Sequence, residues 1–315
     1  MIRVALDAMG GDLGPRVAFE GAVEVLSRYH DLAITIYYSP SSDLELPLSH
    51  ERLSFISCSD VIAGDEEIVR SLFRRKNSSL YRSLMSLSQK DSDVVVTLGN
   101  TGAMVALARH ILGVLRPKLY PALIRELHTN PLRCLVDLGA NVHCPPSMLE
   151  GFAELGAAYV EVLSDEVPRV GLLNVGVENS KGSSVIRETD RILANKSWPK
   201  YLGYAEGTEL FRGEKNVIVC DGMVGNAVLK ASEGLLSFLM GQLKELGEGA
   251  STLFETFYQT ERRHGACLVG VRGNLVKGHG CSDLSAMIGA IEYGVDIARA
   301  DLFSAVEARL CNKAL

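Results

Sequence analysis

The sequence lacks any apolar run near the roughly 20 residues that a membrane-spanning helix needs. It also lacks a basic leader followed by an apolar segment, so we expect no signal peptide and a mature chain that begins at Met1. Excess positive charge is absent as well, because the net charge is −6. That balance gives no general attraction to nucleic acid, and we expect no nucleic-acid partner. Hydrophobic residues make up 47% and charged residues 22%, as in an ordinary soluble globular protein.

Paired cysteines are missing too. The seven cysteines form no CxxC pair and no metal-finger spacing, and Cys134 and Cys220 lie inside apolar runs where a thiol acts as a small hydrophobe. An odd, scattered set predicts a reducing compartment, so we expect a cytoplasmic protein without a metal site. The chain also has neither a Walker loop nor a GxGxxG fingerprint, which disfavours a dinucleotide-dependent dehydrogenase.

The most informative stretch that is present runs from residue 93 to 107 and reads DVVVTLGNTGAMVAL. Residues 94–96 predict a strand buried on both faces of a parallel sheet, and residues 103–110 predict a helix. Between them stand Gly99, Asn100, Thr101 and Gly102. A strand, a glycine turn and a helix N-terminus aim several backbone N–H groups at one point, which attracts anions and phosphate above all.

Five other predicted strands end in the same way, with glycine beside short polar or charged residues. The strands are 2–6, 134–138, 170–175, 217–220 and one or two within 266–277. The polar and glycine residues at or just after these strand ends are Asp7; Asp137 and Asn141; Asn174, Glu178 and Lys181; Asp221, Gly225, Asn226 and Lys230; and Lys277 and His279. Lined up in a parallel sheet, such ends build one cleft of amides and polar side chains. The alternative is that Asp7 and Asp12 only cap turns.

A cluster of positive charge stands out in the acidic chain. It comprises Arg70, Arg74, Arg75, Lys76 and Arg82, in two predicted helical pieces that start at Asp65 and break near Asn77. A solvated helix face is the ordinary interpretation of such a run. Residues 76–79 read KNSS, a helix start whose hydroxyls can hold an anion, so we favour contact with an acidic partner or a phosphorylated carrier.

The remaining pattern completes an α/β chain. We predict a helix from Pro15 to about Tyr29, strands at 32–38 and 53–57, and one or two helices within 282–310. Residues 229–263 predict a helical hairpin broken at 247–249, whose dense apolar positions favour a subunit interface over core packing, with membrane-surface contact third. We find no linker, so residues 1–315 are expected to form one intertwined α/β unit.

Six ordered motifs resemble the PlsX family of phosphate acyltransferases. They are ALDAMGGDLGP from Ala5, GNTGA from Gly99, DLGAN from Asp137, LLN-G-x-E-x-x-KG from Leu172, CDG-x-x-GN-x-x-LK from Cys220, and GA-x-L-x-G-x-x-G-x-x-x-K-x-HG from Gly265. The sequence departs from the family pattern at Val177, where a second glutamate is usual. The resemblance implies a three-layer α/β/α sandwich around a largely parallel or mixed sheet, similar to isocitrate and isopropylmalate dehydrogenases, with two intertwined subdomains.

The resemblance also implies an activity and partners. The family moves a fatty acyl group from acyl carrier protein to inorganic phosphate, and the acyl phosphate feeds glycerol-3-phosphate acylation in phospholipid synthesis. We therefore expect a homodimer, acyl carrier protein as partner, peripheral contact with the inner face of the plasma membrane, and a glycerol-3-phosphate acyltransferase nearby.

Acyl transfer from a thioester to phosphate needs no metal, no cofactor and no protein nucleophile; it needs an anion cradle, an oxyanion donor and a proton-transfer group. We assign the cradle to residues 99–102, helped by Lys277 and Lys181, and the proton transfer to His279. Asn226 or Asn141 would donate to the oxyanion, while Asp221 and Asp137 orient donors or hold the lysines. The substrate-binding set also includes Asp7, Arg75 and Lys76.

Three alternatives stay open. Cys281 could form an acyl-enzyme with His279, although phosphate is already a competent nucleophile. The chain could be a short-chain phosphotransacetylase that uses coenzyme A. It could also be a non-catalytic scaffold that docks lipid enzymes at the membrane.

Overall fold

The computed structural model describes residues 1–11, 14–40, 50–129, 131–246, 265–278 and 283–312. Its chain divides into two compact units. Unit 1 combines two segments far apart in the sequence, Met1–Pro121 and His264–Asn312. Unit 2 comprises Ala122–Arg263 and Lys313–Leu315.

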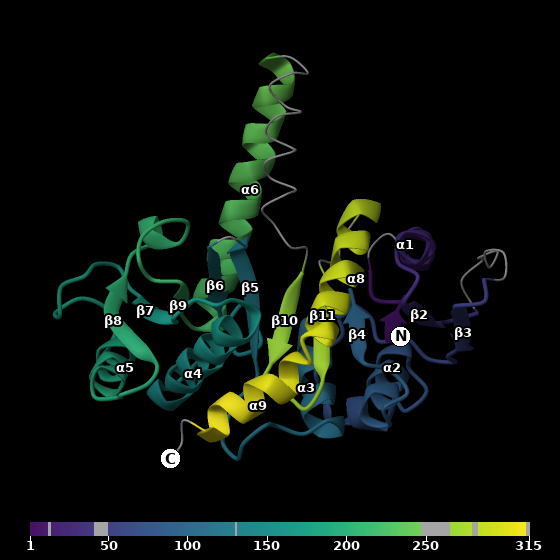
Figure 1. The fold of residues 1–315 in the computed structure, drawn as a ribbon, viewed down its shortest axis with the longest axis horizontal. Helices are drawn as coiled ribbons and strands as arrows, with labels where there is room; N and C mark the ends of the chain where they lie inside the picture. Colours follow the sequence, from purple (N-terminus) through teal and green to yellow (C-terminus); the bar gives the residue numbers. More distant parts are fainter. Residues whose placement is uncertain (12–13, 41–49, 130, 247–264, 279–282, 313–315) are drawn as a thin grey trace. The chain divides into compact units, whose positions relative to one another are not determined.

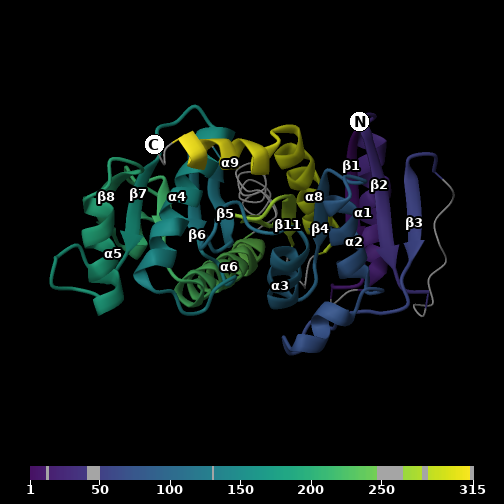
Figure 2. The same ribbon diagram turned by 90° about the horizontal axis from the view of Figure 1, so that it is seen from below.

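Unit 1 is built on a mostly parallel set of strands. Their order is β3-β2-β1-β4-β11-β10, and β10 runs antiparallel to β11 while the others run parallel to their neighbours. Figure 2 shows β3, β2, β1 and β4 side by side. The bounds are β1 (Ile2–Asp7), β2 (Leu32–Tyr38), β3 (Leu53–Ser57), β4 (Val94–Thr97), β10 (Ala266–Val269) and β11 (Asn274–Lys277).

Helices cover both faces of these strands, because each central strand is apolar on both sides. Figure 1 shows α1 and α8 on one side of the strands and α2 and α3 on the other. The bounds are α1 (Pro15–Arg28), the 3-10 turn η1 (Arg70–Arg74), α2 (Ser79–Ser88), α3 (Thr101–Ile111), α8 (Leu284–Arg299) and α9 (Leu302–Asn312).

The strand order of unit 1 reverses between β1 and β4. From β1 the chain winds outward through β2 to β3, and it then returns to the other side of β1 to form β4. In open α/β sheets the loops diverge at such a point, and ligands bind beside the carboxyl ends of the two strands. The topology therefore directs attention to the ends of β1 and β4, at Asp7 and Thr97.

Unit 2 repeats the α/β plan with a different winding. Its strand order is β5-β6-β9-β7-β8, in which β5 and β6 are antiparallel and the remaining neighbours are parallel. The strands are β5 (Ala122–Thr129), β6 (Leu132–Val136), β7 (Arg169–Leu173), β8 (Lys200–Ala205) and β9 (Val217–Val219). The helices are α4 (Pro146–Leu163), α5 (Ser184–Ala194), the 3-10 turn η2 (Gly207–Glu209) and α6 (Gly222–Leu246), which Figure 1 shows extending away from the strands.

The predicted fold class is confirmed, and most predicted elements of the described residues form. Two strand ends were predicted two residues too late: β6 stops at Val136 rather than at residue 138, and β7 stops at Leu173 rather than at residue 175. Two starts were predicted two residues too late as well, because β6 begins at Leu132 and α3 at Thr101. The first of the two helical pieces predicted after Asp65 is only a 3-10 turn over residues 70–74. The stretch 266–277 forms two strands and 282–310 contains two helices, α8 and α9.

Helix α6 begins at Gly222, earlier than the predicted start near residue 229, because Asp221 caps it and the next turn packs closely on β6. A Cβ atom on Gly225 would lie 1.9 Å from the main-chain oxygen of Asp137. The second half of the predicted hairpin and its break at 247–249 lie outside the described residues.

An ion-pair network fixes the segment that precedes α2. The Arg75 guanidinium pairs with the carboxylates of Asp60 and Glu66 and donates to the carbonyl of Val61 at 2.6 Å. The segment also contacts α3, since the Asn100 amide donates to the carbonyls of Gly64 and Glu66 at 2.9 and 3.0 Å. The hydrogen bonds from Arg75 hold the pKa of each carboxyl below its ordinary value.

Gly225→Ala and Gly234→Ala form a matched pair within α6. We expect Gly225→Ala to lower the free energy of unfolding by about 2 kcal/mol or more, because its Cβ collides with the Asp137 backbone. Gly234→Ala meets open space in a helix and is expected to raise that free energy by about 0.5–1 kcal/mol. Urea unfolding measures both, and equal effects would contradict the close approach of α6 to β6.

Arg75→Met tests the ion-pair network. Because the folded pKa of Asp60 and of Glu66 is lowered, their stabilising effect is present above the unfolded values near pH 4 and is lost as pH falls through the folded values. We expect the variant to lose about 1–2 kcal/mol of unfolding free energy at pH 7, and to differ less from wild type below about pH 4. Arg74→Met, at an exposed neighbouring position, is the control. A deficit that is independent of pH would refute the ionic origin.

Candidate active site

Three polar side chains end adjacent parallel strands in unit 1. In the strand register Asp7 lies opposite Thr97, and Thr97 lies opposite Lys277. The carboxyl ends of β1, β4 and β11 therefore present a carboxylate, a hydroxyl and an ammonium in one row. We call this row, with the turn after β4, the carboxyl edge of unit 1.

Asp7 is the buried member of the row, with 2% of its surface exposed. Its Oδ2 accepts a hydrogen bond from the Thr97 hydroxyl at 2.7 Å, and its Oδ1 accepts one from the Met9 N–H at 3.3 Å. Burial raises the pKa of this carboxyl, while hydrogen bonds from Ser79 and Thr97 and the positive charge of Lys277 act in the opposite direction. Asp7 is thus a neighbour of the lysine as well as a turn anchor.

Thr97 connects the Asp7 carboxylate to the turn after β4. Its Oγ1 accepts a hydrogen bond from the Gly99 N–H at 3.0 Å while its own proton goes to Asp7. The turns after β1 and β4 touch here, because a Cβ on Gly10 would lie 2.1 Å from the Gly99 Cα. Only a residue without a side chain fits at position 10.

The turn after β4 opens directly into α3. Asn100 is its N-cap, and its side-chain oxygen accepts from the Ala103 N–H at 2.9 Å. The N–H groups of Thr101 and Gly102, at the first two helical positions, have no acceptor within the helix. These two residues are half-buried, so the helix offers an anion two oriented donors and the positive end of its dipole.

Lys277 brings a full positive charge to the same turn. Its Nζ donates to the carbonyl of Leu98 at 3.1 Å and to the carbonyl of Gly278. The Gly278 N–H in turn donates to the Thr97 carbonyl at 2.9 Å, which fixes the end of β11 against β4. Two backbone carbonyls therefore hold the ammonium beside Leu98, the residue before Gly99. Lys277 itself is half-buried.

In unit 2, Asp137 organises a turn of its own. It is fully buried, and its Oδ1 accepts from the N–H groups of Leu123, Leu138 and Ala140 at 2.8, 2.7 and 3.2 Å. Its Oδ2 accepts from the backbone and side-chain nitrogens of Asn141 at 2.7 and 3.1 Å. Burial raises the pKa of Asp137 and these donors oppose the rise. With five donors on one carboxyl group, Asp137 shapes the turn and orients Asn141.

The start of α6 lies against the Asp137 turn. Asp221 accepts from the Val224 N–H at 2.8 Å, as an N-cap does, and the Gly222 N–H donates to the Asn141 carbonyl at 2.9 Å. Asn226 is exposed near the start of α6, and its Cβ lies 3.8 Å from the place a Cβ would take on Gly139. Asp137, Asn141, Asp221 and Asn226 thus form one group at the carboxyl ends of β6 and β9.

The turn after β7 carries the remaining predicted residues of unit 2. Asn174 donates to the Gly176 carbonyl at 3.0 Å, and the Lys181 N–H donates to the Glu178 carbonyl at 2.9 Å. Lys181 and Glu178 are exposed. The six predicted strand ends therefore fall into two groups of three parallel strands, one in each unit.

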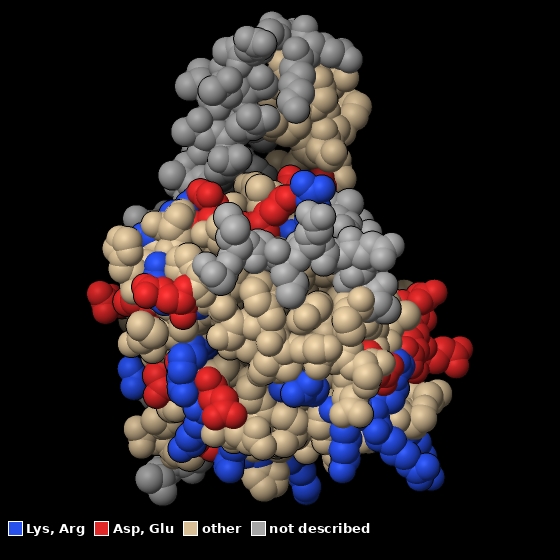
Figure 3. Space-filling model, turned by 90° about the vertical axis from the view of Figure 1, so that its right-hand side faces the viewer, with Lys and Arg blue, Asp and Glu red and all other residues tan. Residues whose placement is uncertain are grey.

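The basic cluster is divided by its contacts. Arg75 is engaged by Asp60 and Glu66, and Arg82 donates to the Ser57 carbonyl at 2.6 Å. Arg70, Arg74 and Lys76 are exposed. Figure 3 shows Lys and Arg side chains along the lower part of the face formed by unit 1, with Asp and Glu higher on its right-hand margin. The predicted helix start at residues 76–79 is confirmed, since the Ser78 hydroxyl caps α2 by accepting from the Tyr81 N–H.

Sequence reasoning assigned no role to Thr97, and it named Ser79 only within the helix start at residues 76–79. Both residues bond Asp7. A polar last residue on an otherwise all-valine strand was the available signal for Thr97. His279 and Cys281 lie outside the described residues. Within the described part of the chain, no group of three or more His, Cys, Asp or Glu could hold a metal ion, and no described helix is both long and apolar enough to span a bilayer.

Known proteins match the whole chain. The family model described as "Fatty acid synthesis protein" matches residues 2–305. A phosphate acyltransferase of Pseudomonas syringae pv. syringae is 36% identical over 326 residues, which cover 98% of this chain and 96% of that protein. A phosphate acyltransferase of Polaromonas sp. is 34% identical, over 100% of this chain and 91% of its own length.

Among solved structures, a branched-chain phosphotransacylase from Enterococcus faecalis V583 has the same fold, with a TM-score of 0.62 over 94% of this chain and 98% of that chain. Its identity of 14% supports the fold alone. The sequence relatives reach further, because they match this chain from end to end at more than a third identity. The chain is an enzyme that belongs to the fatty acid synthesis protein family, the PlsX family of phosphate acyltransferases.

Proposed function

We propose that this enzyme transfers a fatty acyl group from acyl carrier protein to inorganic phosphate and so produces acyl phosphate for glycerol-3-phosphate acylation. The observation that carries the proposal is the position of Lys277, held by the Leu98 carbonyl beside the N-terminus of α3. A cation, two free helix N–H groups and a half-buried turn are the donors that a phosphate requires.

The cradle suits a phosphate that reacts rather than one that is only stored. Its donors are backbone groups and one ammonium, which bind oxygen atoms without closing around the whole anion. Asn100 and Thr101 belong to the turn that the Asp7–Thr97 hydrogen bond fixes, so a phosphate there is oriented before it meets the acyl group. One phosphate oxygen stays available as the nucleophile.

The reaction balances without a protein nucleophile. A phosphate oxygen attacks the thioester carbonyl carbon, the carbonyl electrons move to oxygen, and a tetrahedral oxyanion forms. The C–S bond then breaks, the carbonyl re-forms, and the carrier leaves as a thiolate that takes up one proton. The phosphate proton and the proton for the thiolate are handled by His279, which follows Lys277 by two residues.

We assign the oxyanion donor to Asn226 or Asn141. Asn226 is exposed near the start of α6, and Asn141 is oriented by the Asp137 carboxylate. Asp221 holds the first turn of α6 in place through the Val224 N–H. We keep Lys181, an exposed cation, as a second lysine for the phosphate.

The carrier contact follows from charge. Acyl carrier protein is the acidic partner for the exposed cations Arg70, Arg74 and Lys76. They lie beside the segment that the Arg75 ion pairs stabilise and that Asn100 bonds to the start of α3. We also assign subunit pairing to α6, whose exposed apolar side chains include Leu235 and Phe238, 59% and 63% exposed. The corresponding localisation is the cytoplasm, with peripheral contact to the membrane.

The direct test incubates the full chain with long-chain acyl carrier protein, with and without phosphate, and traps acyl phosphate with hydroxylamine. We expect phosphate-dependent hydroxamate. Parallel reactions with acyl-coenzyme A distinguish a phosphotransacetylase. Release of the acyl group from the carrier at the same rate with and without phosphate would overturn the proposal. Vesicle binding without turnover would indicate the scaffold function instead.

Lys277→Met tests the cradle. We expect phosphate KM to rise about tenfold or more, because a charge-assisted contact of roughly 1.5–3 kcal/mol is lost. Lys118→Met, at an exposed position that does not belong to the carboxyl edge, is the matched control. Initial rates measured over a series of phosphate concentrations give both constants, and an unchanged KM and kcat in Lys277→Met would remove the lysine from the site.

His279→Gln tests the proton-transfer group. This variant should lower kcat by about 10²-fold or more.

Charge reversal at Arg70, Arg74 and Lys76 tests the carrier contact. The triple glutamate variant is expected to raise KM for acyl carrier protein and leave KM for phosphate unchanged, because only the acidic partner meets these side chains. The difference from wild type should shrink as salt rises. Reversal of Arg16 and Arg191, both exposed on other helices, is the control. Equal effects of the two variants would contradict a local docking surface.

A further inference from the structure

A pocket of about 720 Å³ opens in unit 1 away from the carboxyl edge. Its floor is the amino ends of β1, β4 and β11, at Arg3, Asp93 and Asn274. Because these strands are parallel, the pocket lies at the opposite edge of the strands from Asp7 and Lys277. It is therefore separate from the proposed phosphate cradle.

Most of the polar groups in the pocket are already engaged. Arg3 makes two side-chain hydrogen bonds to Asp93, at 2.7 and 3.1 Å, and Arg272 pairs with Glu307 at 3.0 Å. Asn274 donates to the Asp93 carbonyl and accepts from the Phe303 N–H, both at 3.1 Å. These contacts give the pocket a fixed polar floor and leave little unbalanced charge on it.

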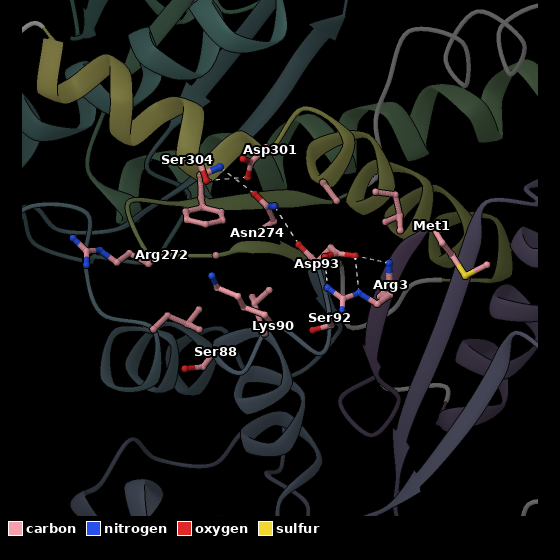
Figure 4. A pocket seen from close by; sticks show the side chains of 16 residues that line it. Met1, Arg3, Ser88, Lys90, Ser92, Asp93, Arg272, Asn274, Asp301 and Ser304 are labelled. Atoms are coloured by element: carbon pink, nitrogen blue, oxygen red, sulfur yellow. Dashed lines mark hydrogen bonds and ion pairs between the residues drawn. The ribbon is translucent and has the colours of Figure 1, made fainter.

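Lys90 is different. Among the residues that the structure describes, it is a lining cation with no carboxylate partner, and it is exposed. Figure 4 shows its side chain extending into the pocket between Arg272 and Asp93. An ammonium aimed into a hollow of this size attracts a negative group.

Lys90 also has an unusual backbone conformation. Lys90 has φ 62° just after α2, where its N–H donates to the Leu87 carbonyl and the Asp91 N–H donates to the Ser86 carbonyl. That pair of bonds is the Schellman end of a helix, in which glycine is the favoured residue. A lysine here costs conformational energy that glycine would not, and it supplies the pocket with its unpaired charge.

The rest of the lining selects the kind of anion. Leu87, Leu112 and Phe303 give an apolar wall. Asp301 also lines the pocket, and its Oδ1 accepts from the Ser304 hydroxyl at 3.0 Å, so the lining holds a carboxylate as well as the Lys90 ammonium. A lining with one such cation and one such carboxylate suits a ligand with a single negative charge better than the double charge of a phosphate ester.

We propose that this pocket is a second ligand site, which binds a small carboxylic acid with an apolar body through Lys90. The strands also connect it to the cradle, because β4 runs from the residue after Asp93 to Thr97 and β11 runs from Asn274 to Lys277. A ligand that presses on Asn274 or Asp93 acts on the same two strands that end at the carboxyl edge.

The test uses the full chain without any acyl donor and titrates it calorimetrically with 2-naphthoate. The comparison ligands are uncharged 2-naphthylmethanol and doubly charged 2-naphthyl phosphate. We expect the carboxylate to bind most tightly of the three. Saturating inorganic phosphate should not displace it, and displacement by phosphate would place the ligand in the cradle and overturn the proposal.

Lys90→Gly and Lys118→Gly form a matched pair, because both lysines are exposed and have positive φ, 62° and 65°. Both variants are expected to keep or raise the wild-type Tm, since glycine relieves the backbone at each position. Lys90→Gly should weaken 2-naphthoate binding about tenfold or more, and Lys118→Gly should leave it unchanged. Equal binding by Lys90→Gly and wild type would mean that Lys90 serves only the end of α2, which refutes the site.

Discussion

The hydrogen bond from the Thr97 hydroxyl to the Asp7 carboxylate is the contact on which the carboxyl edge of unit 1 depends. It joins the ends of β1 and β4 at the point where the strand order reverses. The Thr97 oxygen then accepts the Gly99 N–H, so the same hydroxyl sets the turn that opens α3. Lys277 completes the row from β11 and balances the buried carboxylate. In the proposed anion cradle, a buried carboxylate fixes the turn that carries the donors without occupying them.

Unit 2 solves the same problem in another way. Asp137 is also a buried carboxylate at a strand end, but five nitrogen donors surround it and no lysine is among them. Its turn is therefore rigid without being positive. We interpret unit 1 as the unit that binds phosphate, and the Asp137 turn as the support that orients the amide of Asn141. The two carboxylates share a sequence signature, an aspartate after an apolar strand, and differ in the charge beside them.

Sequence reasoning reached the fold class and most of the strands because buried parallel strands are apolar on both faces and glycine marks their ends. It placed the end of β6 two residues too late, since the carboxylate of Asp137 takes up the turn amides that a strand would have used. It passed over β5 and β8. It grouped the charges near residue 70 as one cluster, whereas Arg75 is paired within the chain and Lys76 is exposed. Strand register, which places Thr97 between Asp7 and Lys277, depends on pairings across the sequence that no local pattern contains.

The central claim is that Lys277 and the N-terminus of α3 hold inorganic phosphate as the nucleophile. Equilibrium binding of phosphate in the absence of any acyl donor tests it most directly, in the wild type and in Lys277→Met. The account predicts saturable binding to the wild type and at least a tenfold weaker affinity in the variant, with the Lys118→Met protein unchanged. Equal phosphate affinity in all three proteins would contradict it.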